Sequence, residues 1–162
     1  MRDLTAGRLR EVLDYDPDTG VFTWKISRRG RVKAGDVAGA LRHDGYIQIG
    51  IDGRLHQAHR LAWLYVTGES PPSEIDHISC VRTDNRIANL RLATRSENQQ
   101  NQSKAQKRNK TGFLGVSPHQ GKFQAQIKVD GKVRTIGRFH TPEEAHAAYV
   151  NAKRELHPFG TI

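Results

Sequence analysis

Apolar residues recur at helical spacing in three segments of the chain. The first segment has Thr5 at the N-cap position and an apolar face that continues to about residue 14. The second covers residues 59–66 and ends before a glycine, and the third opens with a capping box at 141–144 and keeps one apolar face to residue 156. These patterns predict three amphipathic helices.

Strands are predicted where apolar and polar residues alternate, or where β-branched and aromatic residues gather. The second pattern occurs in a short run at 21–24. Residues 46–51 alternate and lead directly into Asp52-Gly53, a dipeptide that favours a tight hairpin. Residues 54–58 are therefore predicted to form the return strand.

A change in composition divides the chain near residue 105. Residues 99–111 are rich in Gln, Asn, Lys, Arg and Ser and contain almost nothing apolar, which is typical of a helix tail that continues into a linker. Three runs of strand-type composition follow, at 113–116, 123–129 and 133–139. The predicted fold class is α+β, ending in a three-stranded antiparallel sheet packed on one helix.

Between these parts the sequence predicts a hairpin followed by a helix. Residues 74–78 form a short strand with Asp76 beside His77, and residues 84–94 return as a second strand. Thr94 and the glutamate three residues later complete a capping box, which places Asn98 in the first turns of a helix. A carboxylate, an imidazole and an amide are thus carried by one strand–strand–helix unit.

Charge and cysteine content narrow the possible partners. The chain has 26 lysines and arginines against 17 aspartates and glutamates, and its formal net charge is +9, which favours a polyanionic partner, with nucleic acid as the leading candidate. There is no run of about 18 apolar residues and no basic amphipathic segment, so we expect an intracellular, cytoplasmic protein that does not bind membranes. Cys80 is the only cysteine, which excludes an internal disulfide and a cysteine-based structural zinc site.

Three segments of the predicted hairpin and helix resemble the ββα-metal core of phage HNH homing endonucleases. They read Asp76-His77-Ile78, Asp84-Asn85-Arg86-Ile87-Ala88-Asn89-Leu90-Arg91 and Ser96-Glu97-Asn98-Gln99-Gln100-Asn101. Upstream, residues 15–20 and 58–65 also resemble stretches that precede this core. The resemblance therefore covers nearly all of residues 1–104, with the core at about 74–104.

The resemblance implies a role for each of four residues. His77 would be the general base that takes a proton from the attacking water, and Asn89 would position His77 or the phosphate. Asp76 and Asn98 would bind one divalent ion, Mg²⁺ or alternatively Mn²⁺, through hard oxygen ligands. The alternative is that these polar side chains only satisfy backbone groups in a polar loop.

One part of the sequence departs from the family pattern. Relatives commonly have Asn-Gly after the Asp-His pair, whereas this chain has Ser79-Cys80. If that glycine has a positive φ, Cys80 introduces backbone strain, and the pattern leaves open whether this lowers the activity.

Residues 112–156 resemble an AP2/ERF domain, in which a three-stranded sheet enters the major groove of DNA. Alternation along the middle strand places Gln124, Gln126 and Lys128 on the face away from the helix. By matching positions, the resemblance adds further DNA-binding residues: Ser117, His119, Lys122, Thr135 and Arg138. The face of Arg134 is left open by the pattern.

The sequence therefore predicts an HNH endonuclease module at 1–104, a linker at 105–111 and an AP2/ERF-like DNA-binding domain at 112–162. The predicted function is metal-dependent hydrolysis of a phosphodiester bond in DNA, by nicking or double-strand cleavage, with no obligate protein partner. One alternative is a DNA-binding regulator whose nuclease centre has decayed. A second is an RNA-binding protein, although the sheet lacks the aromatic stacking surface expected of one.

Overall fold

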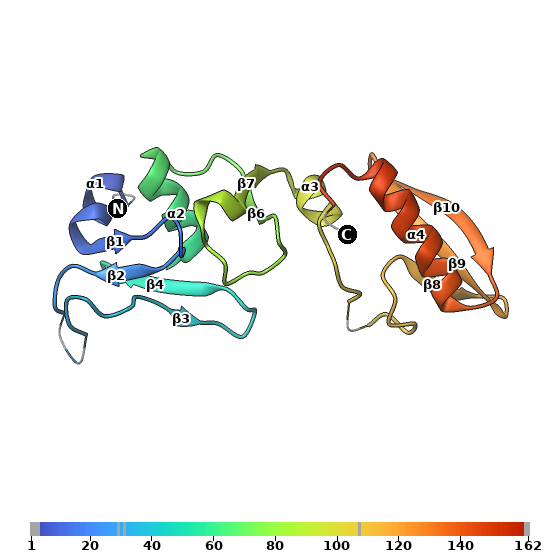
Figure 1. Cartoon of the computed structure of the whole chain (residues 1–162), viewed down its shortest axis with the longest axis horizontal. Helices are drawn as coiled ribbons and strands as arrows, with labels where there is room; N and C mark the ends of the chain where they lie inside the picture. The colour runs from blue at the N-terminus through green and yellow to red at the C-terminus, as the bar shows by residue number, and fades with distance from the viewer. Residues whose placement is uncertain (1–3, 29, 31, 107, 161–162) are drawn as a thin grey trace. The chain divides into compact units, whose positions relative to one another are not determined.

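The computed structural model describes residues 4–28, 30, 32–106 and 108–160, and these divide into two compact units (Figure 1). Unit 1 extends to Ala93 and unit 2 begins at Thr94. The predicted module boundary at residue 104 stays a prediction, because dense contacts within a unit do not show which segments share a function. Within the described ranges, no helix is both long and apolar enough to cross a membrane.

Unit 1 contains most of the elements. In chain order they are α1 (Ala6–Val12), β1 (Leu13–Tyr15), β2 (Phe22–Trp24), β3 (Ala40–Leu41), β4 (Ile47–Ile51), β5 (Arg54–Gln57), α2 (Ala58–Thr67), β6 (Glu74–His77), the short 3₁₀ helix η1 (Ile87–Asn89) and β7 (Leu90–Ala93). Strands β1 and β2 pair with each other, β3, β4 and β5 form a second antiparallel sheet, and β6 pairs with β7. One apolar core connects these sheets with the two helices, and Leu9, Leu13 and Ile49 are fully buried in it.

Unit 2 starts with the short helix α3 (Arg95–Gln100) and continues into a sheet covered by one long helix. Its strands are β8 (Val116–His119), β9 (Lys122–Val129) and β10 (Lys132–Phe139), in the spatial order β10-β9-β8, and its helix is α4 (Pro142–Leu156). Figure 1 shows α4 lying along one face of this sheet, where Ala145 and Tyr149 pack against Val116, Ala125 and Ile127. The predicted fold class, with a three-stranded antiparallel sheet packed on one helix, is confirmed.

The tight hairpins follow from their sequences. Asp52-Gly53 joins β4 to β5 with φ of 48° and 78°, and Asp130-Gly131 joins β9 to β10 with φ of 50° and 77°. Two consecutive positive φ values are the geometry of a type I′ turn, whose twist matches that of the flanking strands. Gln120-Gly121, between β8 and β9, has the same geometry, although its sequence gives a weaker hairpin signal.

Several predicted element bounds were wrong. The first helix ends at Val12 rather than near residue 14, because Leu13 takes extended backbone (φ −127°) and pairs with Trp24 as the start of β1. The predicted strand 84–94 is a strand only from Leu90, because residues 87–89 form η1. The predicted strand 113–116 lies three residues later, as β8, where Ser117 pairs with Gln124.

Candidate active site

The β6–β7 hairpin places a carboxylate and an imidazole next to each other in the interior of unit 1. Asp76 pairs with Arg91 across the hairpin and His77 pairs with Leu90, and their exposed fractions are 5% and 4%. Both Nε and Nη2 of Arg91 lie close to Oδ2 of Asp76, at 2.9 Å and 2.7 Å. A buried carboxylate needs such a partner, so Arg91 holds Asp76 in a fixed orientation.

His77 lies among buried polar and aromatic side chains from three other segments. Its Nε2 is 3.3 Å from Oδ1 of Asn85, and its ring centroid is 5.1 Å from that of His59 on α2 and 5.9 Å from that of Tyr46. Burial lowers the pKa of His77 below its usual 6.5, although the hydrogen bond to Asn85 and the charge of Asp76 act in the opposite direction. His77 is therefore neutral at pH 7 and able to accept a proton.

His59 packs edge-on against His77, with ring planes at 80°. Burial, together with the smaller effects of His77 and Arg60, lowers the pKa of His59 to about 3. Because His59 also stays neutral near pH 7, it does not repel a proton arriving on His77.

Asn89 holds the loop that follows His77. Its Oδ1 accepts a hydrogen bond from the backbone N–H of Ser79 at 2.9 Å, and its Nδ2 donates to the carbonyl of Asp84 at 2.8 Å. The carbonyl of His77 accepts from the N–H of Cys80 in the same loop, at 2.8 Å. Asn89 thus fixes both ends of the loop, and a direct role for it on His77 or a phosphate stays a prediction.

Cys80 has the left-handed backbone conformation that the family pattern suggested for this position. Its φ is 60°, a region that costs a residue with a Cβ about 1 kcal/mol relative to glycine. The loop after the Asp-His pair therefore carries backbone strain in this chain.

Four residues that contact Asp76 or His77 were assigned no catalytic or metal-binding role from the sequence: Asn85, Tyr46, His59 and Arg91. Asn85 lies within the family-like segment 84–91, so its position in that motif was an available signal. Tyr46 precedes β4 and gave no signal, but Arg82 lies 4.9 Å above its ring and donates to the carbonyl of Asp44 at 2.6 Å. These contacts connect the β6–β7 loop to the segment before β4.

Asn98 lies on α3, in unit 2. Thr94 caps this helix by accepting from the N–H of Glu97 while the Glu97 carboxylate accepts from the N–H of Thr94, so the predicted capping box is confirmed. Asn98 is half-buried and donates its backbone N–H to the carbonyl of Thr94 at 2.9 Å. Asp76, His77 and Asn89 thus share unit 1, and Asn98 belongs to the next element along the chain.

The predicted metal ligands fit a hard cation. The carboxylate of Asp76 and the amide oxygen of Asn98 are ligand types that suit Mg²⁺ or Mn²⁺. In the described part of the chain there is no group of three or more His, Cys, Asp and Glu side chains arranged to hold a metal. With one carboxylate, the protein alone supplies few ligands, and DNA oxygens and water would complete the shell.

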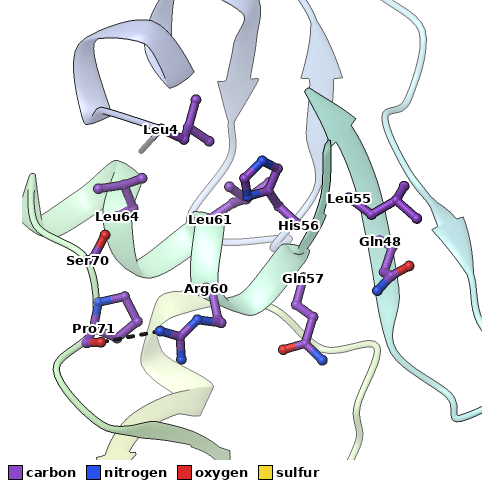
Figure 2. A pocket seen from close by; sticks show the side chains of 10 residues that line it. All are labelled: Leu4, Gln48, Leu55, His56, Gln57, Arg60, Leu61, Leu64, Ser70 and Pro71. Atoms are coloured by element: carbon purple, nitrogen blue, oxygen red, sulfur yellow. Dashed lines mark hydrogen bonds between the residues drawn. The ribbon is translucent and has the colours of Figure 1, made fainter. Parts of the chain in front are cut away.

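A pocket of about 440 Å³ in unit 1 contains none of the predicted site residues. It is lined by Leu4, Gln48, Leu55, His56, Gln57, Arg60, Leu61, Leu64, Ser70 and Pro71 (Figure 2). The guanidinium of Arg60 points toward the carbonyl of Pro71, 3.3 Å away, and so ties α2 to the segment before β6. We assign this pocket no part in the chemistry.

The sheet of unit 2 brings the predicted DNA-binding residues onto one face. Gln124, Gln126 and Lys128 alternate along β9 with Ala125 and Ile127, whose exposed fractions are 0% and 2%. The strand register places the other predicted residues beside them: Ser117 and Arg138 next to Gln124, Thr135 next to Gln126, and His119 next to Lys122. All eight therefore face away from α4.

Two details of β10 complete this face. Nε2 of Gln124 donates to the hydroxyl of Thr135 at 3.1 Å, which links neighbouring strands on the outer side. Arg134 pairs with Ile127, so the structure places it on the side of the sheet that carries α4. A bulge between Thr135 and Gly137 changes the alternation and returns Arg138 to the outer face.

One protein-family model matches a segment that begins in unit 1 and ends near the start of unit 2. Residues 56–100 match the family model described as HNH endonuclease, and this range contains Asp76, His77, Asn89 and Asn98. The family generally uses a divalent metal. The match does not reach residues 112–156, whose resemblance to AP2/ERF domains stays a prediction.

A solved structure is similar to part of this chain. No match to this chain was found among curated protein sequences. The structure is that of the HNH homing endonuclease I-HmuI, from work on its DNA binding and cleavage, with 25% sequence identity and a TM-score of 0.42. The similarity covers 54% of this chain, which spans about half (49%) of that protein. By the family model, residues 56–100 match the HNH endonucleases, which are phosphodiester hydrolases.

Proposed function

We propose that this protein is a metal-dependent DNA endonuclease of the homing type, in which the β6–β7 hairpin carries the catalytic base. The observation that carries the proposal is His77, a buried and neutral imidazole beside Asp76, inside the range that matches HNH endonucleases. A general base for hydrolysis near pH 7 must be unprotonated, and burial keeps His77 in that state.

Each of these protein groups has a separate role in the hydrolysis. His77 accepts a proton from a water molecule, and the oxygen of that water forms a bond to phosphorus while the bond to the leaving oxygen breaks. Arg91 orients Asp76, and Asn89 holds the loop behind His77. By the family resemblance, Asp76 and Asn98 would hold a divalent ion, Mg²⁺ or Mn²⁺, and that ion would supply positive charge to the oxygens of the reacting phosphate.

We propose that the outer face of the β8–β10 sheet binds double-stranded DNA and gives the enzyme its sequence preference. Glutamine offers a donor and an acceptor to adenine, and lysine and arginine contact guanine or phosphate. Gln124 and Gln126 lie in the middle of this face, with Lys128, Lys122 and Arg138 around them. Residues 105–162 carry 10 basic and 4 acidic side chains, so this half of the chain also has the greater positive charge.

The assignment of the base is tested with His77→Ala. We expect DNA binding to persist while the rate of Mg²⁺-dependent DNA cleavage falls by about 10²-fold or more, since a general base typically contributes that much. His140→Ala is the matched control, because His140 is exposed in unit 2 and outside the hairpin. Cleavage by His77→Ala at the wild-type rate would reject the assigned base.

The assignment of the DNA-binding face is tested with two lysines. Lys128 lies on the outer face, whereas Lys132 pairs with Val129 on the other side. We expect Lys128→Ala to weaken binding and to reduce the slope of log affinity against log salt concentration by about 0.9, the loss of one phosphate contact. Lys132→Ala should leave the slope unchanged, and equal slopes for the two variants would count against this face.

A further inference from the structure

Asn85 is a fully buried polar residue beside His77 that has no part in the function proposed above. Its exposed fraction is 1%, and its Oδ1 lies 3.3 Å from Nε2 of His77. Its Nδ2 donates to the carbonyl of Thr83, also at 3.3 Å. Because the amide N–H₂ is directed to a carbonyl, the oxygen of the amide is the atom that faces the imidazole.

An acceptor oxygen at this position has a chemical consequence for His77. A neutral imidazole carries one N–H, and a hydrogen bond to Oδ1 of Asn85 requires that hydrogen to be on Nε2. The lone pair that can accept a proton is then on Nδ1. The identity of the basic nitrogen therefore follows from the residue that faces the other nitrogen.

The acceptor is rigidly held. The hydroxyl of Tyr15 donates to the backbone carbonyl of Asn85 at 2.8 Å, in the buried interior. Gly20, with φ of 73°, packs so closely that a Cβ there would lie 2.6 Å from the carbonyl carbon of Asn85. The turn after β1 thus clamps the backbone of Asn85 against movement.

The imidazole is also confined from other directions. His59 meets it edge-on, and Tyr46 lies 5.9 Å away between centroids. The amide of Asn89, expected from the sequence to position His77, is engaged by the backbone of Ser79 and Asp84. Asn85 is accordingly a buried residue whose side chain contacts a ring nitrogen of the imidazole.

We propose that Asn85 is a positioning residue that holds His77 in the tautomer protonated on Nε2, so that Nδ1 is the nitrogen that takes the proton from water. The catalytic part of this proposal rests on the proposed function of His77 as general base. The tautomer itself does not, because it is a property of the free protein.

The test is an NMR measurement of the ring nitrogens of His77 in the ¹⁵N-labelled full chain, without DNA or metal, at pH 8. We expect the wild type to show the Nε2–H tautomer. Asn85→Leu, which removes the acceptor at similar size, should shift the population toward Nδ1–H, and Asn85→Asp, which keeps an acceptor oxygen, should restore Nε2–H. A wild type with its hydrogen on Nδ1 would overturn the proposal, even where neither variant folds.

Cleavage kinetics give the second readout. Asn85→Leu should lower kcat by about 10²-fold with little change in KM, and Asn85→Asp should recover at least part of that loss. Asn151→Leu is the matched control, because it makes the same substitution at an exposed asparagine on α4, outside the hairpin. A folded Asn85→Leu that keeps both the wild-type tautomer and the wild-type kcat would overturn the proposal. If His77→Ala cleaved normally, the proposed function would fail while the NMR result still decided the tautomer.

Discussion

Cys80, in the loop between β6 and β7, has a strained backbone conformation. Its φ of 60° suits glycine, whereas an alanine there keeps the Cβ that makes this region unfavourable. We expect Cys80→Gly to be more stable than Cys80→Ala by about 1 kcal/mol in urea unfolding. Equal stability of the two variants, or a more stable alanine variant, would show that this backbone is not strained.

His59 makes the stability of unit 1 depend on pH. The pKa of His59 is 6.5 in the unfolded chain and about 3 in the folded protein. The contribution of neutral His59 to the free energy of unfolding is therefore complete above pH 6.5 and is lost as the pH decreases below that value. Each pH unit below 6.5 removes about 1.4 kcal/mol, which is about 2 kcal/mol between pH 6.5 and 5.

The prediction is checked by comparing His59→Gln with the wild type in urea unfolding at pH 6.5 and pH 5. Glutamine stays neutral, so the variant should lose less stability over this range than the wild type. The carboxylates with lowered pKa values, such as Asp52 and Asp84, remain ionised there and do not mask the effect. The same loss of stability in both proteins would contradict the burial of a neutral His59.

The sequence singled out candidate site residues but did not predict their contacts. Asp76, His77 and Asn98 stand out through motif spacing, and two of them do lie together in the hairpin. The neighbours of His77 were not predictable, because Tyr46, His59 and Asn85 come from three separate segments. Periodicity assigns a side chain to a face of its own element, and only the packed fold shows which faces meet.

At the scale of elements, two glycines of unit 2 have the same backbone conformation but differ in how closely other side chains pack around them. Gly115 and Gly131 have nearly equal φ values of 76° and 77°. A Cβ on Gly115 would lie 2.0 Å from the ring of Tyr149, whereas a Cβ on Gly131 would meet nothing within 4 Å. Substitution by alanine therefore has the same backbone cost at both positions and a steric cost at Gly115 alone.

We expect Gly131→Ala to lower the free energy of unfolding by about 1 kcal/mol and Gly115→Ala to lower it by about 1–3 kcal/mol more. Unfolding of the full chain in urea, followed by far-UV circular dichroism, measures both. Equal losses would mean that α4 does not pack on the sheet at Gly115.

The elements were predicted well where the local signal was strong. The Asp52-Gly53 turn and the capping box that starts at Thr141 predicted one hairpin and α4, and alternation along β9 correctly separated its two faces. Strands β1 and β3 were missed, because Leu13 fits a helix face equally well and a two-residue strand has no period. Alternation along the sequence does not predict the bulge in β10, so only the structure shows which face of the sheet carries Arg134.

On the scale of the whole molecule, we propose that the β6–β7 hairpin of unit 1 hydrolyses DNA and that the β8–β10 sheet of unit 2 recognises it. Helix α3 connects the two, since it follows β7 directly, carries Asn98 and clusters with unit 2. The sequence predicted this helix within the first module, because the linker signal starts only after it. Contacts with the C-terminal segment accompany its membership of unit 2: a Cβ on Gly160 would lie 3.4 Å from the carbonyl oxygen of Gln100, at the end of α3.

The central claim is that the intact chain hydrolyses DNA with the help of a divalent metal. The most direct measurement incubates the purified full chain with supercoiled plasmid and with phage DNA, with Mg²⁺ or with EDTA, and follows nicked and linear products. We expect products with Mg²⁺ and none with EDTA. Retained DNA binding without metal-dependent products on either DNA would contradict the claim and identify the protein as a DNA-binding regulator.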